Sequence, residues 1–298
     1  MADYRLMGVL NVTPDSFSDG GLFLDAQAAV QHGLELVEQG ADILDIGGES
    51  TRPGAEPVEE EEEKRRVVPV IEALAAATRS LPEPPQLSID TSKAAVARAA
   101  LAAGATLVND VSALRADPDM ASVVAGSNAD CCLMHMLGEP RTMQRMGGPR
   151  YKDVVDDVRA FLEERLSFAV REGIAEQRVV LDPGIGFGKT VAHNLELLRR
   201  LGEIVAVGCP VLVGTSRKSF LGVVLSAKMG ALRARAGGVV AEPLPMAERL
   251  PGTIATNVMA YEQGASVFRV HDVAPVADAL AVAAATLSGK WTASPTTT

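Results

Sequence analysis

The chain has 298 residues, of which 47% are hydrophobic, and its formal net charge is −10 at pH 7. This length suits one large α/β domain or two small ones, and the negative charge argues against nucleic acid or an anionic membrane as a partner. No run of about eighteen apolar residues occurs, so the sequence predicts no transmembrane helix.

The amino terminus and the cysteines predict a cytoplasmic protein. Residues 1–5 lack a basic segment followed by a leader-like apolar stretch, which argues against a signal peptide. Cys131, Cys132 and Cys209 form no Cys-x-x-Cys motif, and no histidine is spaced from them as in zinc sites. We expect buried thiols, with the adjacent Cys131 and Cys132 on opposite faces of one strand.

Short β-rich runs alternate with helical patterns along the chain. Eight strand–helix units are expected, because each parallel strand needs a crossover before the next one. The expected strands are 6–11, 42–46, 86–90, 106–110, 131–135, 179–182, 211–214 and 266–270. The expected helices are 25–39, 60–77, 93–103, 119–125, 153–173, 192–201, one from Ser219 and one over 274–287.

Eight such units predict the α/β class, with a single (β/α)8 TIM barrel over residues 1–287 and the active site at the carboxyl ends of the strands. The alternative, a doubly wound sheet, needs a glycine-rich phosphate turn after the first strand. Residues 11–21 are too long for that turn and lack its fingerprint. Residues 227–246 are predicted to be a flexible insertion, and 288–298 a disordered tail.

A run of five glutamates, 59–63, precedes Lys64, Arg65 and Arg66. Acids at a helix start and bases one turn later suit the helix dipole and i,i+4 pairing. The run therefore predicts a solvated helix face rather than a binding site.

Unusual polar residues gather where the predicted strands end. Singly, each could be a structural cap, but together they are costly to bury without partners, which favours a binding site. The candidates are Asn11, Asp90, Asn109, Asp182, Lys218, Arg269 and His271, with Met134 near the end of the fifth strand.

The residue types indicate the chemistry of the ligand. Asp90, Asn109 and Asp182 suit a flat heterocycle with an amidine-like edge, because carboxylates accept paired N–H bonds and an amide offers a donor and an acceptor. Lys218 would then face a ring carbonyl or a ring nitrogen. Arg269 and His271 lie on one face of a strand and, with Asn11, suit an anion.

The segment 184–190 looks like a phosphate-binding P-loop but does not match it. The Walker pattern has four residues between its first glycine and Gly-Lys-Thr, whereas three stand between Gly184 and Gly188. We expect Lys189 at a helix start on the barrel rim.

Seven segments resemble the pterin-binding family, and within it the dihydropteroate synthases, across nearly the whole chain. They are 7–21, 45–54, 88–91, 108–111, 181–187, 214–219 and 269–272. The resemblance implies a transferase of folate biosynthesis that joins para-aminobenzoate to 6-hydroxymethyl-7,8-dihydropterin pyrophosphate through a pterin cation. It also implies Mg²⁺ as cofactor, a homodimer, and sulfonamides as competitors of para-aminobenzoate.

The resemblance assigns roles to particular residues and implies that Asp90, Asp182, Lys218, Arg269 and His271 serve catalysis. The pterin would be held by Asp90, Asn109, Met134, Asp182 and Lys218. The pyrophosphate would be held by Asn11, Arg52, Arg269 and His271, with Asn11 also binding Mg²⁺. The aminobenzoate pocket would comprise Phe17, Thr51, Arg52, Pro53, Phe187, Ser216 and Lys218. Loops 12–21 and 47–54 are expected to be mobile when empty and to close over the second substrate.

Two related readings are alternatives. A methyltetrahydrofolate-binding methyltransferase domain shares the barrel but is not expected to carry the motif 17–21 or the triplet Ser216-Arg217-Lys218. A non-catalytic pterin-binding paralogue predicts losses among the anion and loop residues, and none is found. A structural barrel without a ligand would leave the clustered charges unexplained.

Overall fold

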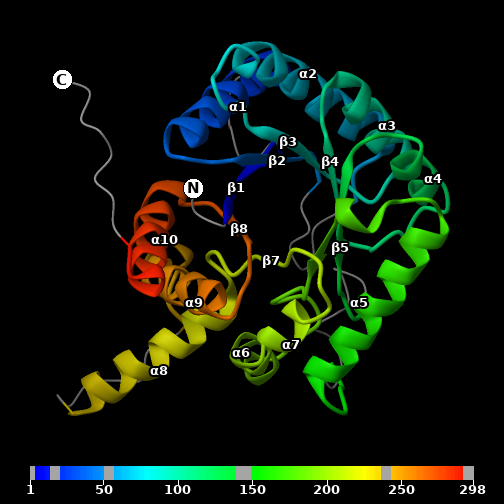
Figure 1. Ribbon diagram of the computed structural model, residues 1–298. Helices are drawn as coiled ribbons and strands as arrows, with labels where there is room; N and C mark the ends of the chain where they lie inside the picture. Colours follow the sequence, from blue (N-terminus) through cyan, green and yellow to red (C-terminus); the bar gives the residue numbers. More distant parts are fainter. Residues whose placement is uncertain (1–3, 14–20, 50–56, 139–148, 236–242, 291–298) are drawn as a thin grey trace.

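The computed structural model describes residues 4–13, 21–49, 57–138, 149–235 and 243–290. Eight parallel strands form one sheet in the order β6-β5-β4-β3-β2-β1-β8-β7, with helices around it (Figure 1). A bridge between Leu181 and Val211 brings the two outer strands together, so the predicted (β/α)8 barrel is confirmed. The strands are β1 (Arg5–Asn11), β2 (Ile43–Gly47), β3 (Gln86–Asp90), β4 (Leu107–Asp110), β5 (Asp130–Met134), β6 (Val179–Asp182), β7 (Leu212–Val213) and β8 (Val267–Val270).

The helices follow the strands as predicted, with two additions. They are α1 (Gly21–Glu38), α2 (Glu60–Thr78), α3 (Ala94–Ala103), α4 (Met120–Ala125), α5 (Val154–Arg171), α6 (Val191–Arg199), α7 (Gly202–Val205), α8 (Ser219–Arg235), α9 (Leu250–Glu262) and α10 (Val273–Ser288). Short 3-10 turns occur at Glu176–Arg178 and Met246–Glu248. The sequence did not predict α7 or α9.

Helix α9 escaped prediction because its buried face is small and polar. That face consists of Gly252, Thr253, Thr256, Asn257 and Ala260. Hydrophobic periodicity, the main sequence signal for a helix, is therefore weak here. A proline in the first turn suits a helix start but reads in a sequence as a break.

The prediction of an irregular insertion at 227–246 is wrong for its first part, because α8 continues to Arg235 and projects away from the barrel (Figure 1). Alanine, leucine, methionine and arginine dominate this part, and all four are strong helix formers. Residues 236–242 lie outside the described part. Of the predicted tail, Ser288 is the last residue of α10, and 291–298 are not described.

Two apolar layers hold the barrel together. The larger lies between the strands and the surrounding helices, and it includes Cys131. The smaller fills the barrel interior, and it includes Cys132, which confirms that the two thiols face opposite sides. Its members are Met7, Ile43, Leu107, Cys132, Val180, Leu212 and Val267.

Two residues further along the strands the barrel interior changes from apolar to polar. Because side chains alternate along a strand, the next residue on the inner face after Ile43 is Asp45, after Leu107 it is Asn109, and after Val180 it is Asp182. Val267 is followed in the same way by Arg269. The period of two along the strands thus stacks a polar layer on the apolar one, at the end of the barrel where the candidate site lies.

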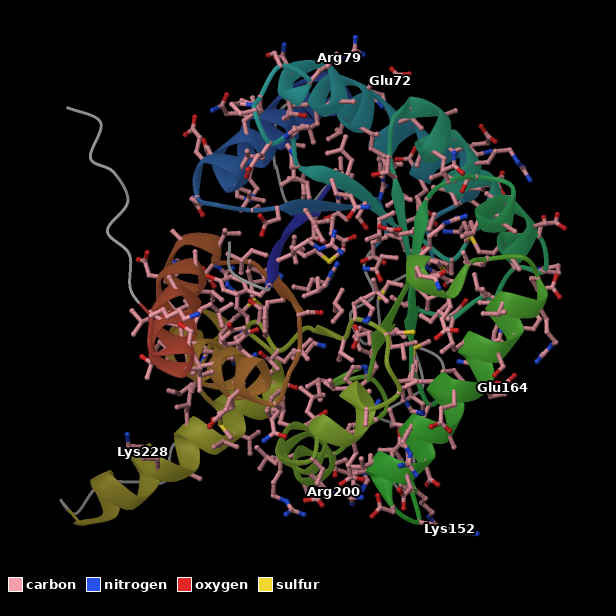
Figure 2. All side chains as sticks on the ribbon, in the orientation of Figure 1. Glu72, Arg79, Lys152, Glu164, Arg200 and Lys228 are labelled. Carbon is pink, nitrogen blue, oxygen red and sulfur yellow. The ribbon has the colours of Figure 1, made fainter. Side chains whose placement is uncertain are left out.

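Charged side chains such as Glu72, Arg79, Lys152 and Glu164 lie on the outer circumference (Figure 2). The acidic run of α2 makes the expected helix pairs, for example Lys64 with Glu60 at 2.7 Å. Glu63 is the exception, because it is fully buried. No helix in the described ranges is long and apolar enough to span a membrane.

Candidate active site

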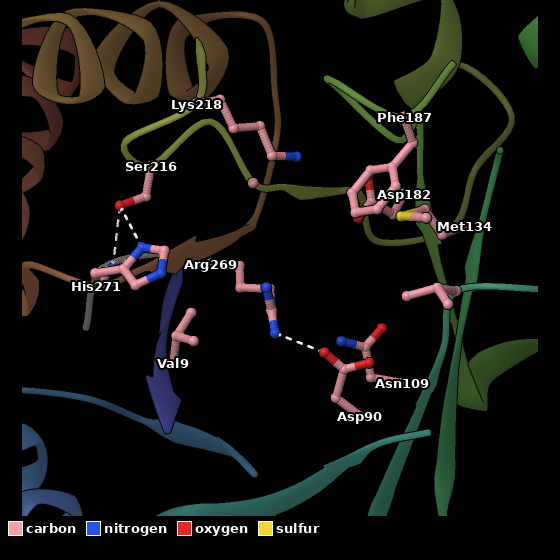
Figure 3. A pocket seen from close by; sticks show the side chains of 12 residues that line it. Val9, Asp90, Asn109, Met134, Asp182, Phe187, Ser216, Lys218, Arg269 and His271 are labelled. Atoms are coloured by element: carbon pink, nitrogen blue, oxygen red, sulfur yellow. Dashed lines mark hydrogen bonds and ion pairs between the residues drawn. The ribbon is translucent and has the colours of Figure 1, made fainter. Parts of the chain in front are cut away.

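A solvent-open cavity lies at the carboxyl ends of the strands (Figure 3). Val9, Val111 and Gly214 form part of its wall. The structure also brings together there many of the residues predicted from the sequence, namely Asp90, Asn109, Met134, Asp182, Phe187, Ser216, Lys218, Arg269 and His271.

Arg269 of β8 lies between two carboxylates. Its Nε is 2.6 Å from Asp45 Oδ2, and its Nη2 is 2.8 Å from Asp90 Oδ2, as Figure 3 shows for Asp90. Burial lowers the pKa of Arg269, but the two carboxylates outweigh burial and the pKa is raised overall. The guanidinium is therefore charged and is held toward the acids, a pairing that the sequence did not predict.

Asp45 is a site residue that the sequence analysis missed. Its carboxylate is fully buried and accepts hydrogen bonds from Ser88 Oγ at 2.6 Å, Asn109 Nδ2 at 3.1 Å and Arg269 Nε. Because Asn109 donates to Asp45, its Oδ1 is the amide atom left to accept from a ligand. Its sequence signal is a lone acid within the apolar strand Ile43–Gly47, away from the strand end where the other polar residues lie.

Asp90 is a buried acid whose ionisation is shifted toward the neutral form. Its pKa is raised to about 7, mainly by burial and also by the neighbouring Asp45, against the opposing effect of Arg269. A carboxyl that ionises near pH 7 responds readily to charge placed beside it. Asp90 is therefore suited to stabilise a cation that forms in the cavity.

Asp182 and Lys218 face each other across the other side of the cavity. Burial raises the pKa of Asp182, which Lys218 opposes, and burial lowers the pKa of Lys218 to about 8, which Asp182 opposes. Asp182 accepts a hydrogen bond from the Gly184 amide at 2.7 Å. The Lys218 Nζ donates to the Ile185 carbonyl and lies 4.6 Å from the centre of the Phe187 ring. The end of β6 and the loops after β6 and β7 thus supply an acid, a lysine and an aromatic ring to one wall.

Residues 216 and 217, in the loop after β7, form polar contacts with residues 271 and 272, which follow β8. The Ser216 hydroxyl accepts from the His271 amide at 3.1 Å and lies 3.0 Å from His271 Nδ1 (Figure 3). Arg217 forms a two-point ion pair with Asp272, with Nε 2.9 Å from Oδ2. Arg217 has φ +57°, an uncommon left-handed conformation, and lies between the two cavity residues Ser216 and Lys218. This turn lets Arg217 pair with Asp272 while both neighbours line the cavity.

Several predicted residues do not line the described cavity. Asn11 ends β1 opposite Gly47 and is half-buried, but it does not line the cavity wall. Phe17, Thr51, Arg52 and Pro53 lie outside the described residues, as do most of the two loops expected to be mobile. Their predicted roles stay predictions.

A buried acid helps hold the first residues of the loop 47–54 in place. Glu63 of α2 and Glu49, which follows β2, both form ion pairs with Lys93. The Gly48 carbonyl accepts from Arg66 Nη1 at 2.9 Å. Glu63 thus helps fix the end of β2, which explains why it departs from the solvated face predicted for its run.

The cavity's chemistry is that of recognition and charge stabilisation. Its acids, amide and lysine can satisfy a polar planar molecule. The Ser216 hydroxyl, which lies 3.0 Å from His271 Nδ1, also accepts from the His271 backbone amide, so this contact ties two loops together. Within the described residues, no group of three or more His, Cys, Asp or Glu side chains could hold a metal ion. A cation here would need oxygen atoms from the ligand as well.

Comparison with known proteins agrees with this geometry. The family described as pterin binding enzyme matches residues 7–271. A dihydropteroate synthase of Clostridium beijerinckii is 45% identical over 90% of this chain and 88% of its own length. The dihydropteroate synthase of Xanthomonas albilineans with 4-aminobenzoic acid superposes with a TM-score of 0.81 at 46% identity, covering 96% of this chain and 93% of that one. The Yersinia pestis enzyme in a sulfonamide drug complex gives a TM-score of 0.83 at 43% identity, covering 96% and 94%.

These matches place the barrel and its polar mouth among transferases that handle pterins. Fold, cavity residues and whole-chain similarity agree with one another. The chain belongs to the pterin-binding enzyme family, and within it to the dihydropteroate synthases.

Proposed function

We propose that this chain condenses 6-hydroxymethyl-7,8-dihydropterin pyrophosphate with para-aminobenzoate, forming 7,8-dihydropteroate and releasing pyrophosphate. The observation that carries the proposal is the convergence of Asp90, Asn109, Asp182 and Lys218 on one cavity beside Arg269. The family match supports the pterin, and the Xanthomonas relative with 4-aminobenzoic acid supports the second substrate.

The pterin fits the polar wall of the cavity. Carboxylates at Asp90 and Asp182 would accept N–H bonds from its aminopyrimidine edge, and Asn109 Oδ1 would accept another. Lys218 would donate to the ring carbonyl or a ring nitrogen. Met134 and Phe187, which pack together in a small apolar cluster, would cover the ring face.

The pyrophosphate would lie toward β1 and β8, near Asn11, Arg269 and His271. Mg²⁺ would be held at this end chiefly by the phosphates of the substrate and by water, with Asn11 offering an amide oxygen. When bound, Mg²⁺ would neutralise charge on the pyrophosphate and make it a better leaving group. Arg52 lies outside the described residues, and its contribution stays a prediction.

The reaction needs no protein nucleophile. The bond between the methylene carbon and the pyrophosphate oxygen breaks, and its electron pair leaves with the pyrophosphate. The positive charge spreads over the pterin ring, where the carboxylates of Asp90 and Asp182 stabilise it. The amine nitrogen of para-aminobenzoate then bonds to the methylene carbon, and its proton passes to water.

The test is pyrophosphate release by the purified chain with Mg²⁺ and the dihydropterin pyrophosphate, with and without para-aminobenzoate. We expect release that depends on para-aminobenzoate and equals the dihydropteroate formed. Tight pterin binding without turnover would instead indicate the non-catalytic paralogue. Transfer of a methyl group from methyltetrahydrofolate would indicate the methyltransferase domain.

Sulfonamides should compete with para-aminobenzoate. The Yersinia pestis relative was solved in a sulfonamide drug complex, and Phe187, Ser216 and Lys218 lie together in the cavity of this chain. Inhibition kinetics at several para-aminobenzoate concentrations should give a raised KM and an unchanged kcat. Purely non-competitive inhibition would contradict the pocket assignment.

The homodimer and the cytoplasmic location also stay predictions, since they come from the resemblance and from the buried thiols. Within the described residues all three cysteines are buried and unpaired, in agreement with the expected core thiols. Sedimentation of the purified chain would measure the oligomeric state, and a species of about twice 31.2 kDa is expected.

A further inference from the structure

Lys189 is a buried lysine beside the cavity for which the proposed mechanism has no use. It lies two residues before α6, at a helix start as expected from the sequence, but only 5% of it is exposed. Its Nζ lies 2.9 Å from His135 Nδ1, 3.1 Å from the Phe187 carbonyl and 3.4 Å from the His135 carbonyl. Burying an ammonium group costs free energy unless acceptors surround it, and these three contacts supply them. A lysine buried at this cost beside the cavity suggests a role in the site.

The three contacts match the three hydrogens of an ammonium group. His135 Nδ1 accepts only when the imidazole is neutral with its proton on Nε2. Burial, followed by the charge of Lys189, lowers the pKa of His135 to about 3, which keeps the ring neutral. Burial lowers the pKa of Lys189 to about 7, while Asp182 favours the charged form and Lys218 opposes it. His135 and Lys189 therefore form an acceptor–donor pair and not a pair of competing bases.

The loop that Lys189 holds is closely packed against the end of β5. A Cβ atom at Gly184 or Gly188 would overlap the carbonyl oxygen of His135 or Leu137, respectively. Tyr151 adds a neutral contact, since its hydroxyl donates to the Gly188 carbonyl at 2.8 Å. Contacts at Gly184 and at Gly188, on either side of Phe187 in the sequence, thus fix the backbone of residues 184–188.

This loop carries two groups that contact Lys218. The Ile185 carbonyl accepts from Lys218 Nζ, and the Phe187 ring lies 4.6 Å from the same atom. Lys189 Nζ donates a hydrogen bond to the Phe187 carbonyl, and the Tyr151 hydroxyl donates to the next carbonyl, that of Gly188. The position of the Phe187 ring is therefore coupled to the ammonium of Lys189.

We infer that Lys189 is a positioning residue, whose ammonium joins His135 to the Phe187 carbonyl and thereby sets the aminobenzoate side of the cavity. The inference rests on the proposed function, because it concerns the second substrate of that reaction. Lys189 acts through Phe187 and Lys218 and does not itself contact the reacting atoms.

The test is the steady-state kinetics of Lys189→Met, which keeps an unbranched side chain of similar length and removes the three donors. We expect KM for para-aminobenzoate to rise on the order of tenfold, as for the loss of charge-assisted hydrogen bonds, with kcat changed less than about threefold. A merely structural role would lower the fraction of folded enzyme, which reduces the apparent kcat and leaves KM unchanged. That result would overturn the inference.

Tyr151→Phe is the matched control, because it removes a neutral hydrogen bond to the next carbonyl of the same loop and leaves every charge in place. KM for para-aminobenzoate should rise less than about threefold, as expected for a neutral bond on a half-buried group. A rise as large as that of Lys189→Met would show that any fastening of the loop suffices, and it would overturn the role given to the ammonium.

A second pair of variants keeps the test decisive if Lys189→Met does not fold. His135→Asn can place an amide oxygen near the position of Nδ1, whereas His135→Leu offers no acceptor. We expect KM near the wild-type value for His135→Asn and a rise of about tenfold for His135→Leu. If the wild type turns over and the two variants have equal KM values for para-aminobenzoate, the inference is overturned. A wild type without turnover would overturn the proposed function itself, and the inference with it.

Discussion

The two layers of side chains inside the barrel come from the same strands and differ in one respect. The layer near the amino ends, with Met7, Ile43 and Leu107, is apolar and needs only to fill space. The next layer, two residues further along each strand and including Asp45, Asn109 and Arg269, must provide each buried charge with a partner. The apolar layer thus tolerates small changes of shape, whereas the polar layer depends on mutual pairing and leaves its remaining polar atoms for a ligand, within the span of two residues per strand.

The largest effect should come from removing the acid that joins the polar layer. Asp45→Ala leaves Arg269, Ser88 and Asn109 without their common acceptor, and we expect the free energy of unfolding to fall by about 3–5 kcal/mol. Ile43→Val, two residues earlier in the apolar layer, should cost about 1 kcal/mol. Urea unfolding of both variants measures the contrast, and equal losses would contradict the distinction between the layers.

The close contact between β5 and the loop after β6 gives the next largest effect. In Gly184→Ala the new methyl group meets the His135 carbonyl at a position with φ +66°, so we expect a loss of about 3 kcal/mol. Gly208→Ala is the matched control, since Gly208 has φ +104° but open space around its Cβ position. That variant should lose about 1 kcal/mol by thermal unfolding. A loss in Gly184→Ala no greater than in the control would argue against the tight packing.

The pH dependence of kcat/KM for the pterin substrate should sharpen the picture of the polar layer. Asp90, whose pKa burial raises to about 7, must be ionised to stabilise a cation, so the rate should rise as pH increases through 7. Lys218, whose pKa burial lowers to about 8, must keep its proton to donate, so the rate should fall above 8. In Lys218→Arg the alkaline limb should vanish, because arginine does not titrate in this range. An unchanged alkaline limb would assign that limb to another group.

The smallest effect is expected at the partly exposed ion pair beside the cavity. Asp272→Asn weakens the contact with Arg217, and because solvent screens the pair we expect less than about 1 kcal/mol of lost stability. The left-handed turn at Arg217 keeps its other hydrogen bond, from its amide to Thr253 Oγ1 at 3.1 Å. Thermal unfolding measures the change, and a loss as large as that of Asp45→Ala would place Arg217 in the buried network.

The barrel and most of the polar mouth could be predicted from the sequence, because strand ends carry a local signal. Asp90, Asn109 and Asp182 each follow an apolar run, and alternation puts them on the inner face. The residues missed depend on tertiary contacts. Asp45 lies within a strand, and Glu63 lies in a charged run whose other members are solvated.

Lys189 shows the same limit more clearly. Its position before a helix was predictable, but its burial follows from the packing of the loop against the end of β5, which no local pattern encodes. Helix α9 was missed for a related reason, since it packs through small and polar residues. Sequence patterns report the burial of apolar side chains, and they do not report polar side chains buried through mutual contacts.

The most direct measurement of the central claim is calorimetric titration of 6-hydroxymethylpterin into the wild type and Asp182→Asn. Asparagine can still accept from the Gly184 amide, but it replaces one acceptor of the carboxylate with a donor that opposes the N–H edge of the pterin. We expect affinity to fall at least about tenfold while the thermal stability of the free protein does not decrease. Equal affinity in the two proteins would contradict the assignment of the polar layer as the pterin site.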